Sequence, residues 1–261
     1  MTAMENAGGR FSVAIHHLES GEAFQYDADQ PCYAASVIKV PIMATVFHEA
    51  AVGHLTLEEK LIVREEDMVT GSGVLQHLTP GIALSIRDLV VLMIIESDNT
   101  ATNLLIDRLG TQTIQQSMQQ WGLQATQFHH KLQIIPAVDT DAHNTITARE
   151  MAIFLKRMAQ GQVVSWNACR KMIEIMKWQK VNTGLPSLLP VEDRPVGAIP
   201  DWELAHKTGD VTGIEHDVGL LYVPGHTFAI AVCVRDVTVP LRVHAAMGRI
   251  GRILYDAARH T

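Results

Sequence analysis

The chain has 261 residues, of which 47% are hydrophobic and 19% charged, which is enough to bury the core of one large domain or two closely packed ones. Its formal net charge of −7 argues against nucleic acid or an anionic membrane as the main partner. The longest apolar run, residues 89–95 (LVVLMII), is far shorter than the roughly 20 residues that cross a bilayer, so we expect no membrane segment.

The first ten residues contain no apolar core of a signal peptide. We therefore expect a cytoplasmic protein, or a periplasmic or secreted one if a leader was removed. Cys32, Cys169 and Cys233 are odd in number and widely spaced, which argues against a disulfide framework or a structural zinc site. The thirteen histidines include no HExxH motif, and we expect neither a metal nor a cofactor.

The first part of the chain is predicted to form a hairpin and then several helices. Residues 11–15 and 22–26 read as two strands around the turn Glu19-Ser20-Gly21. Helical periodicity then dominates residues 36–178 and predicts helices over 83–95, 100–109, 147–158 and 167–178. Ser85 and Thr147 are candidate N-caps, and Gly110 is a candidate C-cap.

The C-terminal part returns to strands. Residues 202–208, 214–223 and 227–235 predict an antiparallel meander, and residues 243–260 a closing helix. Residues 182–200, with four prolines and two glycines, read as the passage from helices to sheet. The prediction is an α+β fold in which one antiparallel sheet, formed from both chain termini and flanked by helices, carries an inserted all-α region. We expect a sheet subdomain of residues 1–35 and 195–261, a helical subdomain of residues 36–194, and a site at their seam.

A serine and a lysine three residues apart stand in the stretch AASVIKVP. If a helix begins at Ser36, then Ser36 and Lys39 share a face, and the free N–H groups of the helix start favour a developing anion. The apolar neighbours of Lys39 would lower its pKa, so that its neutral amine could take the proton of the serine. An S-x-x-K spacing arises by chance in about half of chains this long, so alone it is weak evidence.

Two further motifs follow in order. Ser97-Asp98-Asn99 lies between two predicted helices, and Lys207-Thr208-Gly209 ends a predicted strand. Each has a plain structural explanation, a helix cap and a glycine turn respectively. Three such motifs in one chain, on a helix start, an inter-helix turn and a strand, favour a serine nucleophile with supporting polar groups.

S-x-x-K, S-D-N and K-T-G are the motif set of class A β-lactamases and penicillin-binding proteins. Residues 71–110 and 206–225 resemble class A β-lactamase-related serine hydrolases throughout, and the resemblance extends over nearly the whole chain from Phe11 onward. The fold of that family, a helical region packed on an antiparallel sheet with the site at their seam, agrees with the predicted elements.

The resemblance implies a role for each catalytic residue. Ser36 would be the acylated nucleophile and Lys39 its proton acceptor. Ser97 would relay a proton to the leaving nitrogen, and Lys207 would place positive charge beside Ser97.

The resemblance also implies substrate contacts. Asn99 would hold the substrate amide and position the catalytic lysine, and Thr208 would bond a substrate carboxylate or carbonyl. The oxyanion hole would consist of the backbone N–H groups of Ser36 and of Asp210, the residue after Gly209.

The sequence departs from the family pattern where deacylation is concerned. Class A β-lactamases carry an E-x-x-L-N segment whose glutamate activates water, and the best counterpart here is residues 129–133 (HHKLQ). Leu132 fits, Gln133 replaces the asparagine, and His129 stands at the place of the glutamate. A neutral histidine can act as a general base, but His129 can equally be a solvated loop residue, and both readings stay open.

A second departure lies in the segment Ile214-Glu215-His216-Asp217. Relatives commonly place there an arginine that helps to hold the substrate carboxylate, whereas Glu215 would repel an anionic substrate. We expect Cys32, four residues before Ser36, to pack beneath the site.

The predicted function is that of a serine hydrolase that forms an acyl-enzyme on Ser36 with a small-molecule β-lactam or a related peptide or ester acyl donor. Deacylation would be slow. The alternatives are an esterase or DD-peptidase-like acyl hydrolase, and a stably acylated penicillin-binding sensor module. We expect the protein to act as a monomer.

Overall fold

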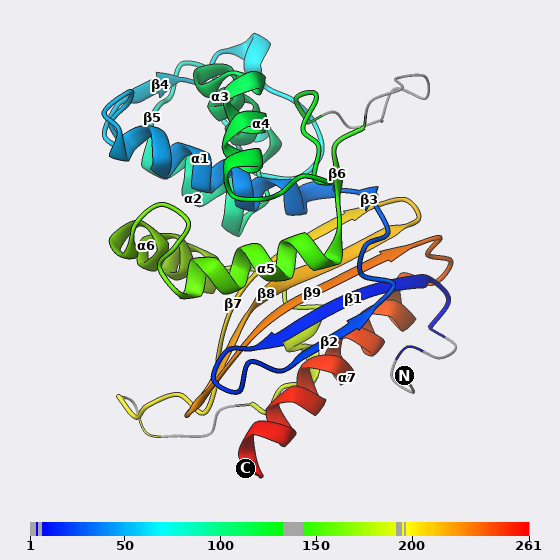
Figure 1. Ribbon diagram of the computed structural model, residues 1–261. Helices are drawn as coiled ribbons and strands as arrows, with labels where there is room; N and C mark the ends of the chain where they lie inside the picture. The colour runs from blue at the N-terminus through cyan, green and yellow to red at the C-terminus, as the bar shows by residue number, and fades with distance from the viewer. Residues whose placement is uncertain (1–3, 5–6, 133–142, 192–194, 196, 261) are drawn as a thin grey trace.

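The computed structural model describes residues 4, 7–132, 143–191, 195 and 197–260 (Figure 1). At its centre lies a five-stranded sheet in which all neighbouring strands are antiparallel. In spatial order the strands are β2 (Ala23–Tyr26), β1 (Arg10–His17), β9 (His226–Arg235), β8 (Ile214–Val223) and β7 (Glu203–Val211). The N-terminal hairpin joins the C-terminal meander through β1 and β9, which confirms a sheet built from both chain ends.

Seven α-helices lie in the described part of the chain. They are α1 (Lys39–Ala51), α2 (Ile86–Ile95), α3 (Asn99–Leu109), α4 (Thr111–Gln120), α5 (Ala148–Ala159), α6 (Trp166–Lys177) and α7 (Pro240–Arg259). Helix α7 covers one face of the sheet, α5 covers the other, and α1 to α4 form a layer beyond α5 (Figure 1). The predicted α+β class is therefore confirmed.

Short elements connect these layers. The 3₁₀ helices are η1 (Ala35–Ile38), η2 (Glu65–Asp67), η3 (Leu75–His77) and η4 (Leu185–Leu188). Two small antiparallel pairs join β3 (Cys32–Tyr33) to β6 (Thr145–Ile146), and β4 (Lys60–Ile62) to β5 (Ala83–Ser85). Element η1 runs directly into α1 and places the start of that helix over the sheet.

Strand β9 contributes side chains to two hydrophobic cores, one on each face of the sheet. Successive side chains of a strand point to opposite faces. The small residues of β9 belong to the core on the helical side and the larger ones to the core under α7; they are Ala229, Ala231 and Cys233 on one side and Ile230, Val232 and Val234 on the other. Because both faces are covered, the strand is an unbroken apolar run, and small side chains let the helical layer approach closely.

Two predicted boundaries are wrong. Residues 83–85, predicted to be helical, form β5, and the helix begins after Ser85, whose hydroxyl accepts the Asp88 N–H at 3.1 Å as an N-cap. Strand β7 does not end at Thr208 but continues through Val211, so the K-T-G motif lies within a strand. Gly209 is therefore not a turn residue, and its role is to let the strand approach the start of η1.

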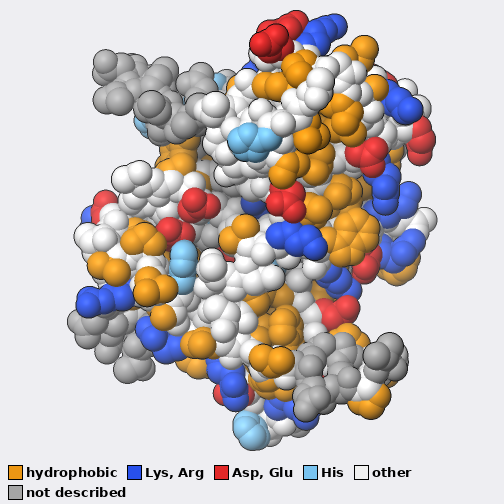
Figure 2. All heavy atoms as spheres, turned by 180° about the vertical axis from the view of Figure 1, so that it is seen from behind, with side chains coloured by type: hydrophobic (Ala, Val, Ile, Leu, Met, Phe, Trp, Pro, Cys, Tyr) orange, Lys and Arg blue, Asp and Glu red, His pale blue; other side chains and the backbone are white. Residues whose placement is uncertain are grey.

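Helix α4 is not among the predicted helices, because its glutamine-rich sequence carries few apolar residues. Within the described residues no helix is both long and apolar enough to cross a bilayer. Acidic and basic side chains are interspersed on the face that Figure 2 shows. The division of the chain into two subdomains at residues 36 and 194 stays a prediction. Helices α5 and α6, which belong to the predicted helical subdomain, pack directly on the sheet.

Candidate active site

Ser36 and Lys39 lie at the junction of η1 and α1. Ser36 is half-buried on η1, and Lys39 is the first residue of α1 and wholly buried. Their spacing puts both side chains on one face, and the Lys39 Nζ lies 3.0 Å from the Ser36 Oγ. The preceding residue, Ala35, has φ of 43°, a left-handed conformation that is strained for a residue with a Cβ.

The buried amine of Lys39 is surrounded by oxygen atoms. Besides the Ser36 hydroxyl, its Nζ lies 2.6 Å from the Ser97 carbonyl oxygen, 3.0 Å from the Ser97 Oγ and 2.9 Å from the Asn99 Oδ1. Burial is the main cause that holds the pKa of Lys39 well below its ordinary value, and the positive charge of Lys207 is the second. The negative charges of Asp98 and Asp210 oppose this shift. Geometry and burial therefore favour a neutral amine that can accept a proton.

Lys207 enters the same network from strand β7. Its Nζ, which is also fully buried, lies 3.1 Å from the Ser97 Oγ and 2.7 Å from the Thr208 carbonyl oxygen. Burial lowers the pKa of Lys207 to about 8, and the carboxylates of Asp210 and Asp217 limit the shift. The Ser97 hydroxyl thus lies between two amines, at 3.0 and 3.1 Å, where a proton can pass from one group to another.

Asp98 holds the serine–asparagine turn in place. Ser97 has φ of 53°, and Asp98 caps α3 by accepting the Ala101 N–H at 2.9 Å. The other Asp98 oxygen accepts the backbone N–H groups of Val74 and Leu75 at 2.7 and 2.8 Å. The sequence marks Asp98 only as part of a motif, and the structure assigns it a positioning role: it fastens the segment before η3 to the turn that carries Ser97.

The strand that carries Thr208, Gly209 and Asp210 lies against the backbone of the nucleophile. A Cβ added at Gly209 would lie 2.9 Å from the backbone nitrogens of both Ser36 and Val37, closer than real Cβ atoms approach. Since β7 is the edge strand of the sheet, half of its N–H groups face away from β8, toward this part of the molecule. The structure thus brings all the expected catalytic and substrate-binding residues to one place.

His129 is not part of this network. Its side chain is exposed, its backbone N–H donates to Asn144 Oδ1 at 2.7 Å, and its imidazole makes no hydrogen bond to any described residue. Gln133, expected in the same motif, lies outside the described residues.

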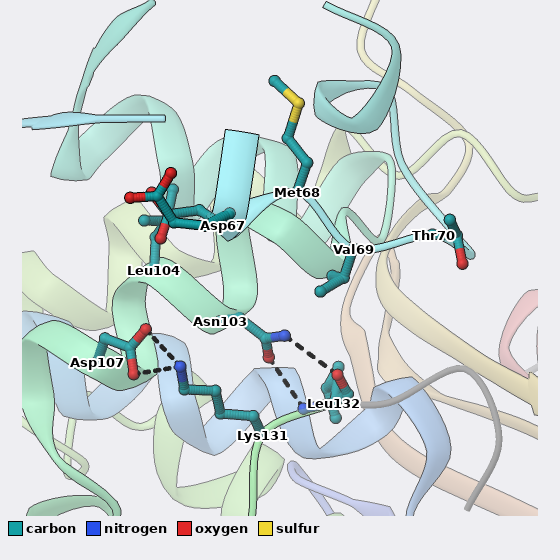
Figure 3. Close-up of a pocket in the computed structure, with 10 residues that line it drawn as sticks. Asp67, Met68, Val69, Thr70, Asn103, Leu104, Asp107, Lys131 and Leu132 are labelled. Atoms are coloured by element: carbon teal, nitrogen blue, oxygen red, sulfur yellow. Dashed lines mark hydrogen bonds and ion pairs between the residues drawn. The ribbon is translucent and has the colours of Figure 1, made fainter. Parts of the chain in front are cut away.

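Leu132, in contrast, is fixed by a side chain of α3. Asn103 Oδ1 accepts the Leu132 N–H at 2.9 Å, and Asn103 Nδ2 donates to the Leu132 carbonyl at 3.1 Å (Figure 3). Asn103 stands four residues after Asn99 and so shares its helix face. Asn99 contacts Lys39, and Asn103, one helical turn further along α3, holds Leu132. The residue held at this place is therefore an apolar leucine. In the sequence, the four-residue spacing of Asn99 and Asn103 is the signal that could have indicated a structural role for Asn103.

A pocket of about 490 Å³ adjoins Leu132 (Figure 3). Glu66 and Asp67 lie on one wall, and Lys131 and Asp107 form an exposed ion pair at 2.6 Å on another. Within the described residues no group of three His, Cys, Asp or Glu side chains could hold a metal ion.

A half-buried serine beside a buried lysine, at the seam between helices and an antiparallel sheet, is the arrangement of a serine β-lactamase-like hydrolase. The model of the beta-lactamase enzyme family matches residues 1–258, and the chain belongs to that family.

Solved structures agree with this assignment. The β-lactamase from Sphaerobacter thermophilus DSM 20745 is similar with a TM-score of 0.91 and 29% identity, over 100% of this chain and 95% of that one. PBP-A is similar with a TM-score of 0.85 and 29% identity, over 100% and 94% of the two chains. A β-lactamase from Chitinophaga pinensis DSM 2588, at 23% identity, TM-score 0.88 and 98% and 97% coverage, shares the fold.

Proposed function

We propose that Ser36 attacks β-lactams, or related peptide and ester acyl donors, to form an acyl-enzyme that is hydrolysed slowly. The observation that carries this proposal is the fully buried Lys39 amine 3.0 Å from the Ser36 Oγ. A serine hydroxyl is a weak nucleophile until a neighbouring base takes its proton, and a desolvated lysine is such a base.

The hydrogen bonds of Lys39 support a neutral amine with its lone pair free. A neutral amine has two N–H groups and one lone pair. The Ser97 carbonyl and the Asn99 Oδ1 can only accept, so they take the two N–H groups. The lone pair is left for a hydroxyl proton, and the Ser36 hydroxyl lies within reach. As the bond between Ser36 Oγ and the carbonyl carbon forms, the negative oxygen would be held by the N–H groups of Ser36 and Asp210.

Collapse of the tetrahedral intermediate requires a proton on the leaving nitrogen. In our proposal Ser97 donates its proton to that nitrogen as the C–N bond breaks and regains one from Lys39. Lys207, at 3.1 Å from the Ser97 Oγ, stabilises negative charge along this path while it is protonated.

Slow deacylation is supported by the residue that Asn103 holds. Hydrolysis of an acyl-enzyme needs a base that activates water, and Leu132 has no titratable group. A water-activating role for His129 remains a proposal, and the exposure of its side chain favours a minor role. An acyl-enzyme that persists would also account for the alternative function, a penicillin-binding module that is acylated and left so.

Two structural relatives support β-lactams as acyl donors. One is a β-lactamase, and the other is PBP-A, a single-residue variant of which has been solved as an acyl-enzyme complex with penicillin G. An esterase or DD-peptidase-like activity is the second candidate. The pairing of Glu215 with His244, Oε2 to Nε2 at 2.9 Å, favours it, because a carboxylate stands where an anionic substrate would need a cation.

The test is to mix the protein with penicillin G and to follow intact mass and β-lactam absorbance together. We expect an adduct on the intact protein that persists for many minutes and is missing in Ser36→Ala. Rapid loss of absorbance without an adduct would contradict slow deacylation. Neither an adduct nor turnover, with Ser36-dependent cleavage of a simple ester, would favour the esterase.

A further inference from the structure

A second pocket, of about 190 Å³, opens beside the strand that touches the nucleophile. Its lining includes Thr208 and Asp210 of β7, Glu215 of β8 and His244 of α7. Thr208 and Asp210 flank Gly209, the residue in close contact with the backbone of Ser36. The pocket therefore adjoins the strand position that contacts the backbone of the nucleophile.

Two carboxylates face each other across the wall of the pocket. Asp210 and Glu215 are direct partners in the antiparallel register of β7 and β8, so their side chains lie on the same face of the sheet. Like charges directly opposite each other destabilise a sheet. The Glu215 carboxylate is paired with His244 at 2.9 Å, whereas the Asp210 carboxylate makes no hydrogen bond to a described residue. Even with His244 protonated, the Asp210 carboxylate has no hydrogen-bonded cation among the described residues, and the charge that it stabilises on Lys207 lies beside Ser97.

Among the described residues, neither Lys207 nor His216 forms an ion pair with Asp210 or Glu215, although, against the effect of its burial, hydrogen bonds raise the pKa of His216. Lys207 stands next to Thr208 and hence points to the opposite face of the strand, where its Nζ contacts Ser97. His216 is 2% exposed, and its two ring nitrogens lie within 2.8 Å of the carbonyl oxygens of Glu215 and Tyr33.

Thr208 points to a ligand independently of these charges. Thr208 is 9% exposed as a residue and lines the pocket. Its hydroxyl nevertheless makes no hydrogen bond to any described residue. The hydroxyl is thus available to exchange a hydrogen bond with a group bound in the pocket.

We infer that this pocket favours acyl donors with a cationic leaving group over those whose leaving group carries a carboxylate, which react more slowly. The inference rests on the proposed acylation of Ser36. We assign the pocket to the leaving group because Thr208, which lines it, directly follows Lys207, whose amine contacts the Ser97 hydroxyl, the proposed proton donor to the leaving group. Glu215 and Asp210 are then specificity-determining residues, and Thr208 accepts a hydrogen bond from, or donates one to, the departing group.

Three thioesters of benzoylglycine test this on the full chain. They carry thiocholine, its uncharged isostere 3,3-dimethylbutanethiol, or 3-mercaptopropionate as the leaving group. In each case the Ser36 Oγ–acyl bond forms, the C–S bond breaks and the serine proton ends on the released thiol, which is measured directly. We expect kcat/KM to fall in that order, with about a 100-fold difference between the cation and the anion.

Glu215→Gln keeps the shape and the contact with His244 while removing one charge, and we expect it to reduce the cation-to-anion ratio about tenfold. Asp210→Asn should reduce it by a similar factor. Glu22→Gln is the matched control, because Glu22 is exposed between β1 and β2, at the edge of the sheet opposite to β7. Its ratio should equal that of the wild type.

Equal rates for the three thioesters, a preference for 3-mercaptopropionate, or an unchanged ratio in Glu215→Gln would overturn the inference. Absence of Ser36-dependent thiol release from all three would instead contradict the proposed acylation. In that case the pocket is tested without chemistry, by calorimetric binding of the same thioesters to Ser36→Ala. The affinity should follow the same order, and affinities without that order would overturn the inference on their own.

Discussion

The two sides of the site differ in how completely their polar groups are arranged. On the acylation side, Lys39, Lys207 and Ser97 are buried and joined by hydrogen bonds of 3.0 and 3.1 Å. On the side of residues 129–132, His129 is exposed and Leu132 contributes only its backbone to Asn103. Burying two lysines is costly, and such a cost is characteristic of functional sites. The contrast supports our proposal that the protein forms an acyl-enzyme and hydrolyses it slowly.

The largest effect should follow from removing the base on the acylation side. Lys39→Met should lower the acylation rate by penicillin G about 10³-fold, because the Ser36 hydroxyl loses its proton acceptor. The melting temperature should stay level or rise, since a buried amine that is costly to desolvate is replaced by an apolar chain of similar size. Stopped-flow mixing with mass detection gives the rate, and calorimetry the melting temperature.

The control for that variant is Lys171→Met, which changes an exposed lysine of α6 and should leave the acylation rate unchanged. An acylation rate in Lys39→Met within about tenfold of the wild type would show that another group activates Ser36.

A carboxylate added among residues 129–132 should accelerate hydrolysis of the acyl-enzyme. Leu132→Glu should speed clearance of the penicillin adduct at least about tenfold, because it places a carboxylate at the position that Asn103 holds next to the Asn99 turn. His129→Glu serves as the comparison and should change clearance less than about threefold. Adduct lifetime by intact mass measures both. A larger acceleration in His129→Glu, or slower clearance in His129→Ala, would make His129 the water-activating position after all.

The acylation side should also respond to pH. Acylation needs Lys39 neutral, so kcat/KM should rise with pH as Lys39 loses its proton. It should fall again near pH 8, where Lys207, whose pKa burial lowers to about 8, loses the charge that assists Ser97. A pH profile of kcat/KM measures both limbs. The alkaline limb should vanish in Lys207→Met, and its persistence there would assign that limb to another group.

An effect on acylation smaller than that of Lys39→Met is expected where the strand meets the nucleophile. Gly209→Ala should lower acylation about tenfold to 100-fold, because its Cβ would displace the backbone of Ser36 by a fraction of an ångström. Gly213→Ala is the control on the same hairpin, where a Cβ meets nothing within 4 Å. That variant has strain from its positive φ but should keep the acylation rate. Equal rates for the two variants would contradict the role given to close packing at Gly209.

Much of this architecture could be predicted from local pattern. The three motifs identify Ser36, Ser97 and Lys207 without any geometry, because each residue type suits acyl transfer and the order matches a known family. Alternating and 3.6-residue periods predict the sheet from both termini and most helices. Element ends are harder to predict, as β5 and the length of β7 show, since strand pairing overrides local turn signals.

The remaining features depend on contacts between distant parts of the chain. No short pattern predicts that Asp98 binds the backbone of residues 74 and 75, or that Asn103 binds Leu132. Both contacts require separate segments of the chain to pack together. The same holds for the opposition of Asp210 and Glu215, which follows only from the register of β7 and β8. Burial of both lysines, and with it their lowered pKa values, is likewise a property of the assembled fold.

The central claim, that Ser36 is the nucleophile on a side built for acylation, is tested most directly by peptide mapping of the penicillin G adduct. We expect the added mass on the peptide that contains Ser36, with none on any other peptide and none in Ser36→Ala. An adduct on a different residue, or one that persists in Ser36→Ala, would contradict the account.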